Sequence, residues 1–256
     1  MLAVPLHGLR MRFSRLRFVV CSLVVGVALA GCAAKTPLTD KPVVRKIALI
    51  PASEPLEFTL GNPTAFIFLS PLVETGIMLS AKAKAKEFSQ KMAARHVVLA
   101  PRLTTIVVDS LRAAGYTVDV LDDIARDPED PDDIDYGKLE TDAEVIVQLR
   151  IREVGVFSPR SSSDYLPRVN VDGKLYIHAL DDAPYDETLY YGVDAQSGNA
   201  GAIKADAKLK YANFDAVMAK TDELQATFEN ATDALARLLA TQLKQALVAR
   251  TRAAPR

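Results

Sequence analysis

An uncharged apolar run near the amino terminus most constrains what this chain can fold into. Residues 18–30 carry no charge, and Ser22 is the only hydroxyl among them. The stretch before them is basic, with four arginines between residues 10 and 17. A spanning helix needs about 20 apolar residues, so the pattern predicts a secretory signal. We therefore expect residues 1–31 to be removed and the remaining chain to fold outside the cytoplasm.

The apolar run ends in Leu29-Ala30-Gly31-Cys32. This sequence resembles the bacterial lipobox, in which the cysteine thiol is diacylglycerated and the chain is cleaved on the amino side of that cysteine. The resemblance implies cleavage between Gly31 and Cys32, and a covalent acyl and diacylglycerol anchor on Cys32. A single acyl chain binds a membrane only marginally, whereas the several chains implied here would hold the protein stably. We expect no other cofactor.

The residues after the lipobox bear on location. In enteric bacteria an aspartate at the position of Ala33 resembles an inner-membrane retention signal. The alanine favours the outer membrane, on its periplasmic face. Residues 32–42 are mostly polar and include Pro37, which predicts a tether between the lipid and a single periplasmic domain over residues 43–250.

Composition excludes several kinds of function. Residues 1–31 contain four arginines and no acid, so their removal changes the formal net charge from −1 to −5. An acidic chain gives no reason to expect nucleic-acid binding, and it argues against a polybasic contact with anionic lipid. Cys21 leaves with the signal and Cys32 carries the lipid. No cysteine then remains for a disulfide, a thiolate metal site or a nucleophile.

Hydrophobic periodicity predicts an α/β (α+β) domain. An apolar run at 46–51, a helical stripe at 101–114 and an alternating segment at 116–121 predict two parallel strands joined by a helix. Three further alternating segments predict an antiparallel meander, and an apolar stripe predicts a long final helix. These four segments are residues 143–157, 168–180, 187–193 and 221–249. The prediction is a mixed sheet of about five strands, packed by the helix after strand one and by the C-terminal helix.

A long insertion at 52–100 interrupts this plan. Links of this kind usually take about 2–6 residues. Residues 77–95 favour a helix, whereas residues 58–79 are apolar but broken by glycine and proline. Apolar residues in an irregular link must be buried somewhere or serve a partner. We predict a partner or ligand surface here, with completion of the core as the alternative. The candidate residues are Phe58, Leu60, Phe66, Phe68 and Leu72.

Catalytic and metal-binding signals are scarce. Beyond residue 31 the only histidines are His96 and His178, and no hydrolase, P-loop or dinucleotide-binding motif is present. The acidic residues between 127 and 135 could hold calcium, but they lack the glycine and distal glutamate of an EF-hand loop. We therefore predict a solvated loop there, no metal site and no enzyme activity.

The order of motifs resembles a known group of lipoprotein domains. The lipobox is followed by Lys-Ile-Ala-Leu-Ile-Pro, a helix ending in Ala-Ala-Gly-Tyr, then Val-Asp-Val-Leu-Asp, Thr-Asp-Ala-Glu-Val-Ile-Val and Val-Asn-Val-Asp-Gly-Lys-Leu. This order is similar to the small α/β domain of the TolB amino-terminal region, the curli-secretion lipoprotein and the penicillin-binding-protein activator lipoproteins. It also resembles uncharacterised proteobacterial lipoproteins. Residues 52–100 and 194–220 depart from the pattern, so pore formation and synthase activation do not transfer.

Two functions fit these observations. The favoured one is a non-catalytic envelope lipoprotein that acts as an accessory or docking protein for another envelope protein. The second is a periplasmic carrier of a small apolar ligand such as lipid, with residues 58–79 as a pocket wall. An enzyme ranks third.

Overall fold

The computed structural model describes residues 44–62, 71–124, 126, 133–159, 162, 164–177, 182–195 and 198–253. The chain divides into two units, residues 1–41 and 42–256, and every described residue belongs to the second. Gly31 and Cys32 therefore lie outside the described residues.

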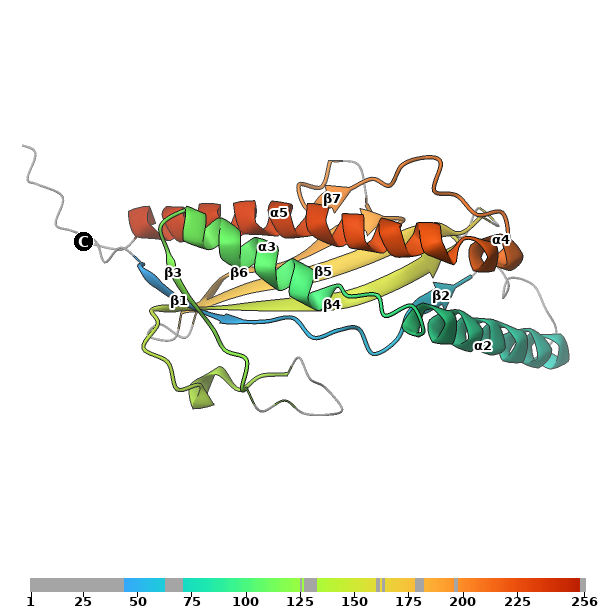
Figure 1. Cartoon of the computed structure of the whole chain (residues 1–256), viewed down its shortest axis with the longest axis horizontal. Helices are drawn as coiled ribbons and strands as arrows, with labels where there is room; N and C mark the ends of the chain where they lie inside the picture. The colour runs from blue at the N-terminus through green and yellow to red at the C-terminus, as the bar shows by residue number, and fades with distance from the viewer. Residues whose placement is uncertain are drawn as a thin grey trace, which may run out of the picture. The chain divides into compact units, whose positions relative to one another are not determined.

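The described residues form a mixed α/β unit (Figure 1). Its elements, in chain order, are β1 Lys46–Ile50, β2 Thr59–Gly61, α2 Pro71–Ala93, α3 Ala100–Ala113, β3 Thr117–Val120, the 3₁₀ turn η2 Tyr136–Lys138, β4 Val145–Phe157, β5 Leu166–Ile177, β6 Asp182–Gly192, β7 Ala202–Ile203, α4 Phe214–Ala219 and α5 Thr221–Ala253. The strands make one sheet in the order β3-β1-β4-β5-β6-β7, and β2 pairs with the far part of β4. The predicted fold class is confirmed.

Strand pairing follows the sequence pattern. β1 runs parallel to both β3 and β4, with Ile47 opposite Val118 on one side and Val145 on the other. β4, β5 and β6 are antiparallel neighbours, which confirms the predicted meander. The described sheet has seven strands rather than about five, because β2 and β7 are only three and two residues long. Segments that short leave no alternation to detect.

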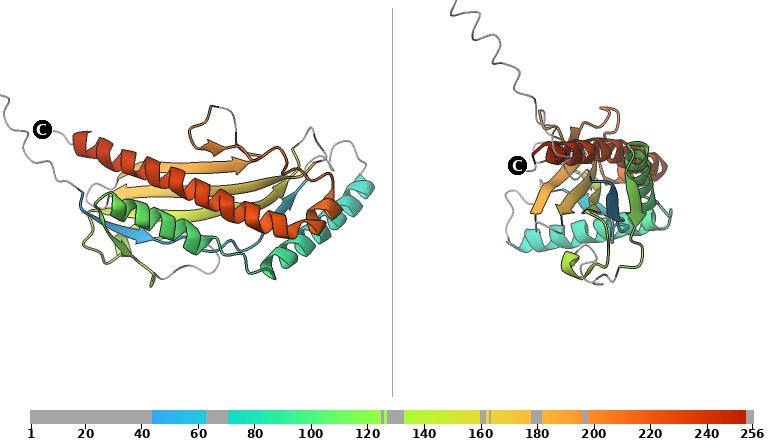
Figure 2. Two further views of the ribbon diagram at one scale, coloured as in Figure 1. Left: turned by 45° about the horizontal axis from the view of Figure 1, so that its top comes forward. Right: turned by 90° about the vertical axis from the view of Figure 1, so that its left-hand side faces the viewer.

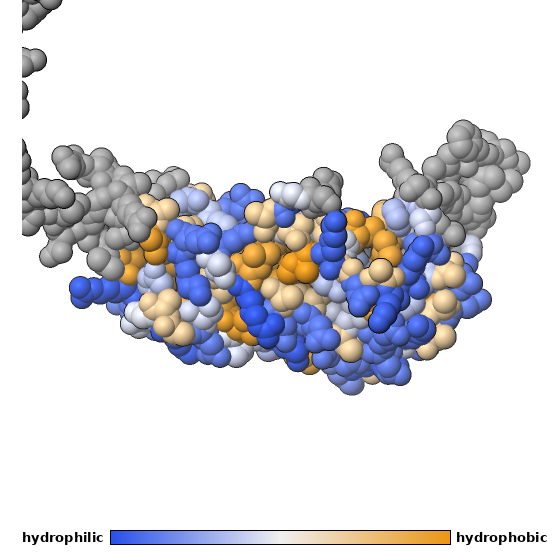
Figure 3. Space-filling view, turned by 90° about the horizontal axis from the view of Figure 1, so that it is seen from above, coloured by the Kyte–Doolittle hydropathy of each residue, from blue (hydrophilic) through white to orange (hydrophobic). Residues whose placement is uncertain are grey.

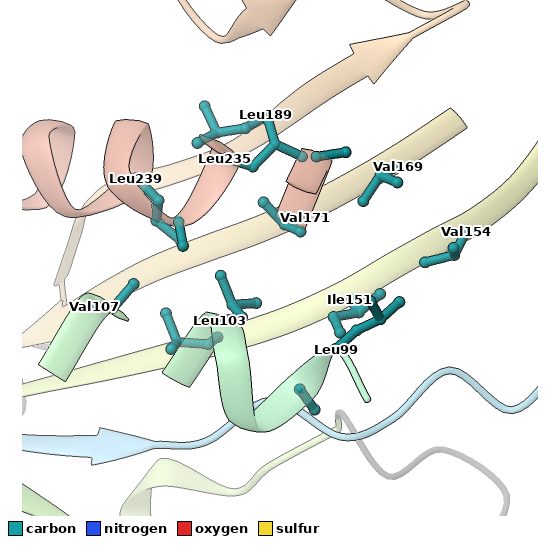
Figure 4. Close-up of a cluster of buried hydrophobic side chains, with 14 of the residues drawn as sticks. Leu99, Leu103, Val107, Ile151, Val154, Val169, Val171, Leu189, Leu235 and Leu239 are labelled. Atoms are coloured by element: carbon teal, nitrogen blue, oxygen red, sulfur yellow. The ribbon is translucent and has the colours of Figure 1, made fainter. Parts of the chain in front are cut away.

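Helices α3 and α5 cover one face of the sheet and enclose the main core (Figures 1 and 4). Gly173 of β5 allows the close approach of α5, since a Cβ there would lie 2.3 Å from a methyl carbon of Leu239. The core side chains labelled in the close-up are Leu99, Leu103, Val107, Ile151, Val154, Val169, Val171, Leu189, Leu235 and Leu239. From the side of α5, the surface is largely hydrophilic with apolar patches between the charged groups (Figure 3).

The apolar stripe of α5 lies against the sheet, and near its end Leu243 and Leu247 are buried. Gln242 and Ala246 border this stripe and are partly buried. Both still face the sheet, since Tyr185 of β6 donates to the side-chain oxygen of Gln242 at 2.6 Å and Ala246 packs against the main core.

The opposite face of the sheet is not uniformly wet. The segment between β3 and β4 was predicted to be a solvated loop, yet Ile134 is buried and Leu139 packs beside it in a second, smaller core. That core rests on Ala48 and Ile50 of β1 and on Ile146 of β4. A central parallel strand is commonly buried on both faces, and this loop provides the second cover.

Candidate functional surface

The insertion begins with an extended segment, residues 51–58, which we call the strap. The Glu54 carboxylate accepts hydrogen bonds from the backbone N–H of Leu99 at 2.9 Å and of Ala100 at 3.0 Å. These N–H groups belong to the start of α3, where Leu99 occupies the N-cap position without a side-chain cap of its own. A carboxylate from a distant segment thus satisfies donors that a helix leaves unpaired, and it complements the helix dipole. The strap is thereby fixed to α3.

Further contacts hold both ends of the strap. Arg126 donates to the backbone oxygen of Pro51 at 2.7 Å and to the Ser53 hydroxyl at 2.9 Å. At the other end, the Phe58 N–H donates to Ser89 Oγ of α2 at 3.1 Å. These bonds fix the backbone on either side of residues 55–57 before any partner binds.

Exposed apolar side chains concentrate in the insertion. Of the five large apolar side chains that are strongly exposed in the described part of the chain, four lie between residues 52 and 100. They are Leu56 at 81 %, Leu79 at 66 %, Met78 at 54 % and Val98 at 48 % exposure, and the fifth is Val248 at 45 %. Single exposed apolar residues are ordinary on a protein surface. Their concentration in the one segment that departs from the predicted plan is what marks the insertion.

Leu56 and Val98 flank the contact between the strap and α3, and together we call them the strap surface. Leu56 follows Glu54 by two residues, and Val98 immediately precedes Leu99, to which Glu54 is bonded. The exposed residues Glu57 and His96 provide polar neighbours along the chain. The result is two apolar side chains on a fixed backbone within a polar surrounding.

Helix α2 is divided between core and solvent. Phe88 and Met92, near its end, are fully buried in the main core. Ala81 and Ala85 are partly buried at helical spacing before Phe88. The helix extends past the end of the sheet (Figures 1 and 2). None of the helices that the structure describes combines the length and apolar character needed to cross a membrane.

The predicted site residues separate into two groups. Phe58 is 7 % exposed and its ring lies 6.1 Å from that of Phe228, so it belongs to the core and not to a surface. The physical reason is that the strap turns inward where it meets α2 and α5. Leu60 is half-buried in β2 and packs against the same core. For these two residues the alternative prediction, completion of the core, is the correct one.

The remaining candidates keep their status as predictions. Leu72 lies in the first turn of α2, while its side chain is outside the described residues, as are Phe66 and Phe68. Leu56 and Val98 were missed by the sequence prediction. Leu56 stands between Pro55 and Glu57, and Val98 lies in the apolar run 97–100 whose other members are buried, so no pattern distinguishes either residue.

Of the two histidines with possible acid–base roles, only His96 lies in the described part of the chain. It is exposed, with a left-handed backbone (φ 51°) just after α2, and His178 lies outside the described residues. No cluster of histidine, cysteine or carboxylate side chains that could hold a metal occurs among the residues described.

A polar pocket of about 260 Å³ opens on the sheet face beside η2. Tyr136 donates to Gln148, stacks on Tyr176 at 4.7 Å and has the Lys174 ammonium 5.3 Å from its ring. Burial raises the pKa of Tyr136 to about 12. The phenol therefore stays neutral near pH 7 and is poorly matched to acid–base catalysis.

A larger pocket of about 620 Å³ lies between the end of β3 and the η2 segment. Its apolar wall is formed by Val120, Leu121, Ile124, Ile134 and Leu139, and five carboxylates lie around it. Its size is in the range of small-molecule sites, which is roughly 300–1,000 Å³.

No protein-family model matches this sequence, and curated protein sequences gave no match. Solved structures do match. A Xanthomonas campestris protein assigned to the family DUF330 is similar over 84 % of this chain and 92 % of its own, with 8 % identity and a TM-score of 0.40. For PelC of Paraburkholderia phytofirmans, solved as a dodecamer, the coverages are 78 % and 95 %, with 11 % identity and a TM-score of 0.32.

Lipoprotein GNA1162 of Neisseria meningitidis is similar over 72 % of this chain and 99 % of its own, with 12 % identity and a TM-score of 0.26. Because all three TM-scores are below 0.5, the proposals below rest on this chain's own residues. The more specific resemblance to the TolB amino-terminal region stays a prediction.

Proposed function

We propose that this protein is a non-catalytic lipoprotein of the bacterial envelope. In this proposal the lipid on Cys32 holds it at the periplasmic face of the outer membrane, and the strap surface docks another envelope protein. The observation that carries the proposal is the concentration of exposed apolar side chains in the 52–100 insertion. A protein that needed only to fold would gain by burying them.

Pre-organisation supports a protein partner at the strap surface. Binding energy at interfaces is dominated by a few anchors in a polar surrounding, and anchors on a fixed backbone lose little entropy when they bind. Leu56 and Val98 meet this description because the Glu54 bonds hold the strap backbone near Leu56 to the start of α3 next to Val98. The covalent anchor would keep the domain close to other envelope proteins.

The second candidate is a carrier of a small apolar ligand. The pocket between β3 and η2 favours it, since its wall contains five aliphatic side chains. The carboxylates around that wall, including Asp122 and Asp133, would restrict such a ligand to one without negative charge.

The two candidates separate in one experiment. The lipidated protein would be extracted natively from membranes and analysed by mass spectrometry, beside a Leu56→Asp/Val98→Asp variant and a Val248→Asp control. We expect a stoichiometric protein partner with the wild type and the control, and its loss from the strap variant. Co-purifying lipid, retained in all three proteins without a partner, would favour the carrier function.

The anchor itself has a direct test. Cys32→Ala should abolish palmitate labelling and leave the amino-terminal signal uncleaved, because the thiol is the acceptor of the lipid. Undiminished label on this variant would contradict the proposed attachment.

A further inference from the structure

The outward half of α2, residues 78–87, carries a surface distinct from the strap. Met78, Leu79 and Ala83 are exposed there, and the first two are 54 % and 66 % exposed. The only described large side chains of α2 that enter the core, Phe88 and Met92, come after this half. The fold therefore accounts for the end of the helix, and within residues 78–87 only Ala81 and Ala85 are partly buried while the other side chains are exposed.

The charged residues of this half are mostly basic. Residues 78–87 contain three lysines and one acid, Glu87, so this segment differs from the net acidic chain on which the expectation of no polybasic lipid contact was based. Lys84 lies 5.5 Å from the ring of Phe214, so it contacts the body of the protein. Lys82 and Lys86 are exposed. They stand three and seven residues after Leu79, so all three side chains share one helix face.

We propose that the outward half of α2 is a second membrane contact, which rests on a bilayer surface that contains anionic phospholipid. Met78 and Leu79 enter the boundary between headgroups and acyl chains, and Lys82 and Lys86 pair with lipid phosphates. This arrangement follows the two-signal logic of peripheral anchoring, in which an acyl anchor is supplemented by basic and apolar groups. It goes beyond the proposed docking function and relies on it only for the lipid on Cys32, which brings the helix to a membrane.

Charge complementarity decides between lipid and protein as the occupant. A protein interface is usually depleted in lysine at its centre, whereas a membrane-surface helix is enriched in it. Lys82 lies about one turn from Met78 and Leu79, and Lys86 lies about two turns from Leu79. The strap surface, in contrast, has Glu57 and His96 as its exposed neighbours and lacks this basic character.

The test uses the full lipidated chain in vesicles. Cys32 is the only cysteine after residue 31, and in the proposed function its thiol is acylated, so an introduced cysteine would be labelled alone. A fluorophore at Ala83→Cys would be compared with one at Thr241→Cys, an exposed position of α5. Quenchers attached to the lipid acyl chains report contact, in phosphatidylcholine vesicles with and without phosphatidylglycerol.

We expect quenching at position 83 and not at position 241, and more of it with phosphatidylglycerol. Lys82→Gln/Lys86→Gln should lower the equilibrium constant for contact between α2 and the bilayer about 30-fold, the equivalent of about 1 kcal/mol per lysine. Lys204→Gln/Lys208→Gln removes the same charge from exposed positions elsewhere and should change nothing.

Equal quenching at positions 83 and 241, or undiminished quenching in the Lys82→Gln/Lys86→Gln protein, would overturn the inference. If a photo-crosslinker at position 83 captured an envelope protein in cells while vesicles gave no quenching, the surface would belong to a protein partner. These results do not test the strap surface, because the strap variants are measured by their capture of the protein partner.

Discussion

Helices α2 and α3 follow one another in the chain, yet they serve the fold to very different degrees. Leu103, Val107 and Leu111 of α3 are fully buried along its whole length, over the sheet. In the described part of α2, Ala81 and Ala85 are partly buried and full burial begins at Phe88. The difference teaches that the insertion contributes β2, Phe58 and the end of α2 to the domain, whereas the large apolar side chains at residues 78 and 79 stay in solvent and are available for another role. Substitutions along the insertion should therefore divide into those that weaken folding and those that weaken binding.

The largest effect is expected in the inner part of α2. Phe88→Ala would leave a cavity in a fully buried position and should lower the free energy of unfolding by about 3–5 kcal/mol. Urea denaturation followed by circular dichroism measures it, with Met78→Ala as the control on the same helix. If the two substitutions cost the same, the division of α2 into core and free halves is wrong.

A smaller effect is expected where the strap meets α3. Glu54→Gln removes the charge that caps the α3 N-terminus and should cost on the order of 1 kcal/mol. Glu57→Gln, which changes an exposed neighbour, should cost little. The loss of stability in Glu54→Gln should shrink with added salt. This variant should also capture less of the partner than the wild type does. A stable Glu54→Gln protein whose capture is unchanged would show that the strap does not need this bond.

The outward half of α2 should tolerate polar substitution. Met78→Ser/Leu79→Ser should change the free energy of unfolding by no more than about 0.5 kcal/mol, because both side chains are already in solvent. The same variant should lose most of the lipid quenching at position 83. A loss of several kcal/mol in urea denaturation would place these residues in the core and contradict the comparison.

The smallest effect concerns the exposed ion pairs at the start of β1. The Lys46 ammonium beside Asp142 holds the pKa of that carboxyl below its ordinary value of 3.8, and Asp142 and Asp119 raise the pKa of Lys46 above 10.5. A lowered carboxyl pKa stabilises the fold above pH 3.8, and this contribution is lost as the pH falls through the lowered value. A raised lysine pKa stabilises the fold below pH 10.5, and this contribution is lost as the pH rises through the raised value.

The stability difference between wild type and Asp142→Asn should therefore be small and constant near neutral pH. It should vanish in acid, and it should be reduced by salt, since both groups are exposed. Denaturation midpoints across the pH range measure it. A difference that grew on acidification would reverse the assigned sign.

The sheet and its covering helices could be predicted from sequence because the hydrophobic pattern within each element repeats. Alternation in β4 and β5 and the stripes of α3 and α5 each run over ten or more residues, so the core face emerges even when single positions deviate. Near the end of α5 the stripe still faces the sheet, where Gln242 accepts a hydrogen bond from Tyr185 of β6 and Ala246 packs against the core.

The functional surface could be predicted only as a region. The length of the insertion marked it, but the assignment of Phe58 was wrong because the inward turn of the strap depends on bonds between distant residues, such as Phe58 to Ser89. Leu56 and Val98 both flank the hydrogen bond between Glu54 and Leu99. These two bonded residues are 45 positions apart in the chain. Contacts between residues so far apart in the chain leave no periodic pattern in the local sequence.

Site-specific photo-crosslinking in cells tests the central claim most directly. A photoreactive residue would be placed at Leu56, at Val98 and at Val248, three exposed apolar positions of which only the first two belong to the strap surface. The account predicts the same discrete protein adduct from positions 56 and 98 and none from position 248. Absence of an adduct at 56 and 98, or an equal adduct at 248, would contradict it.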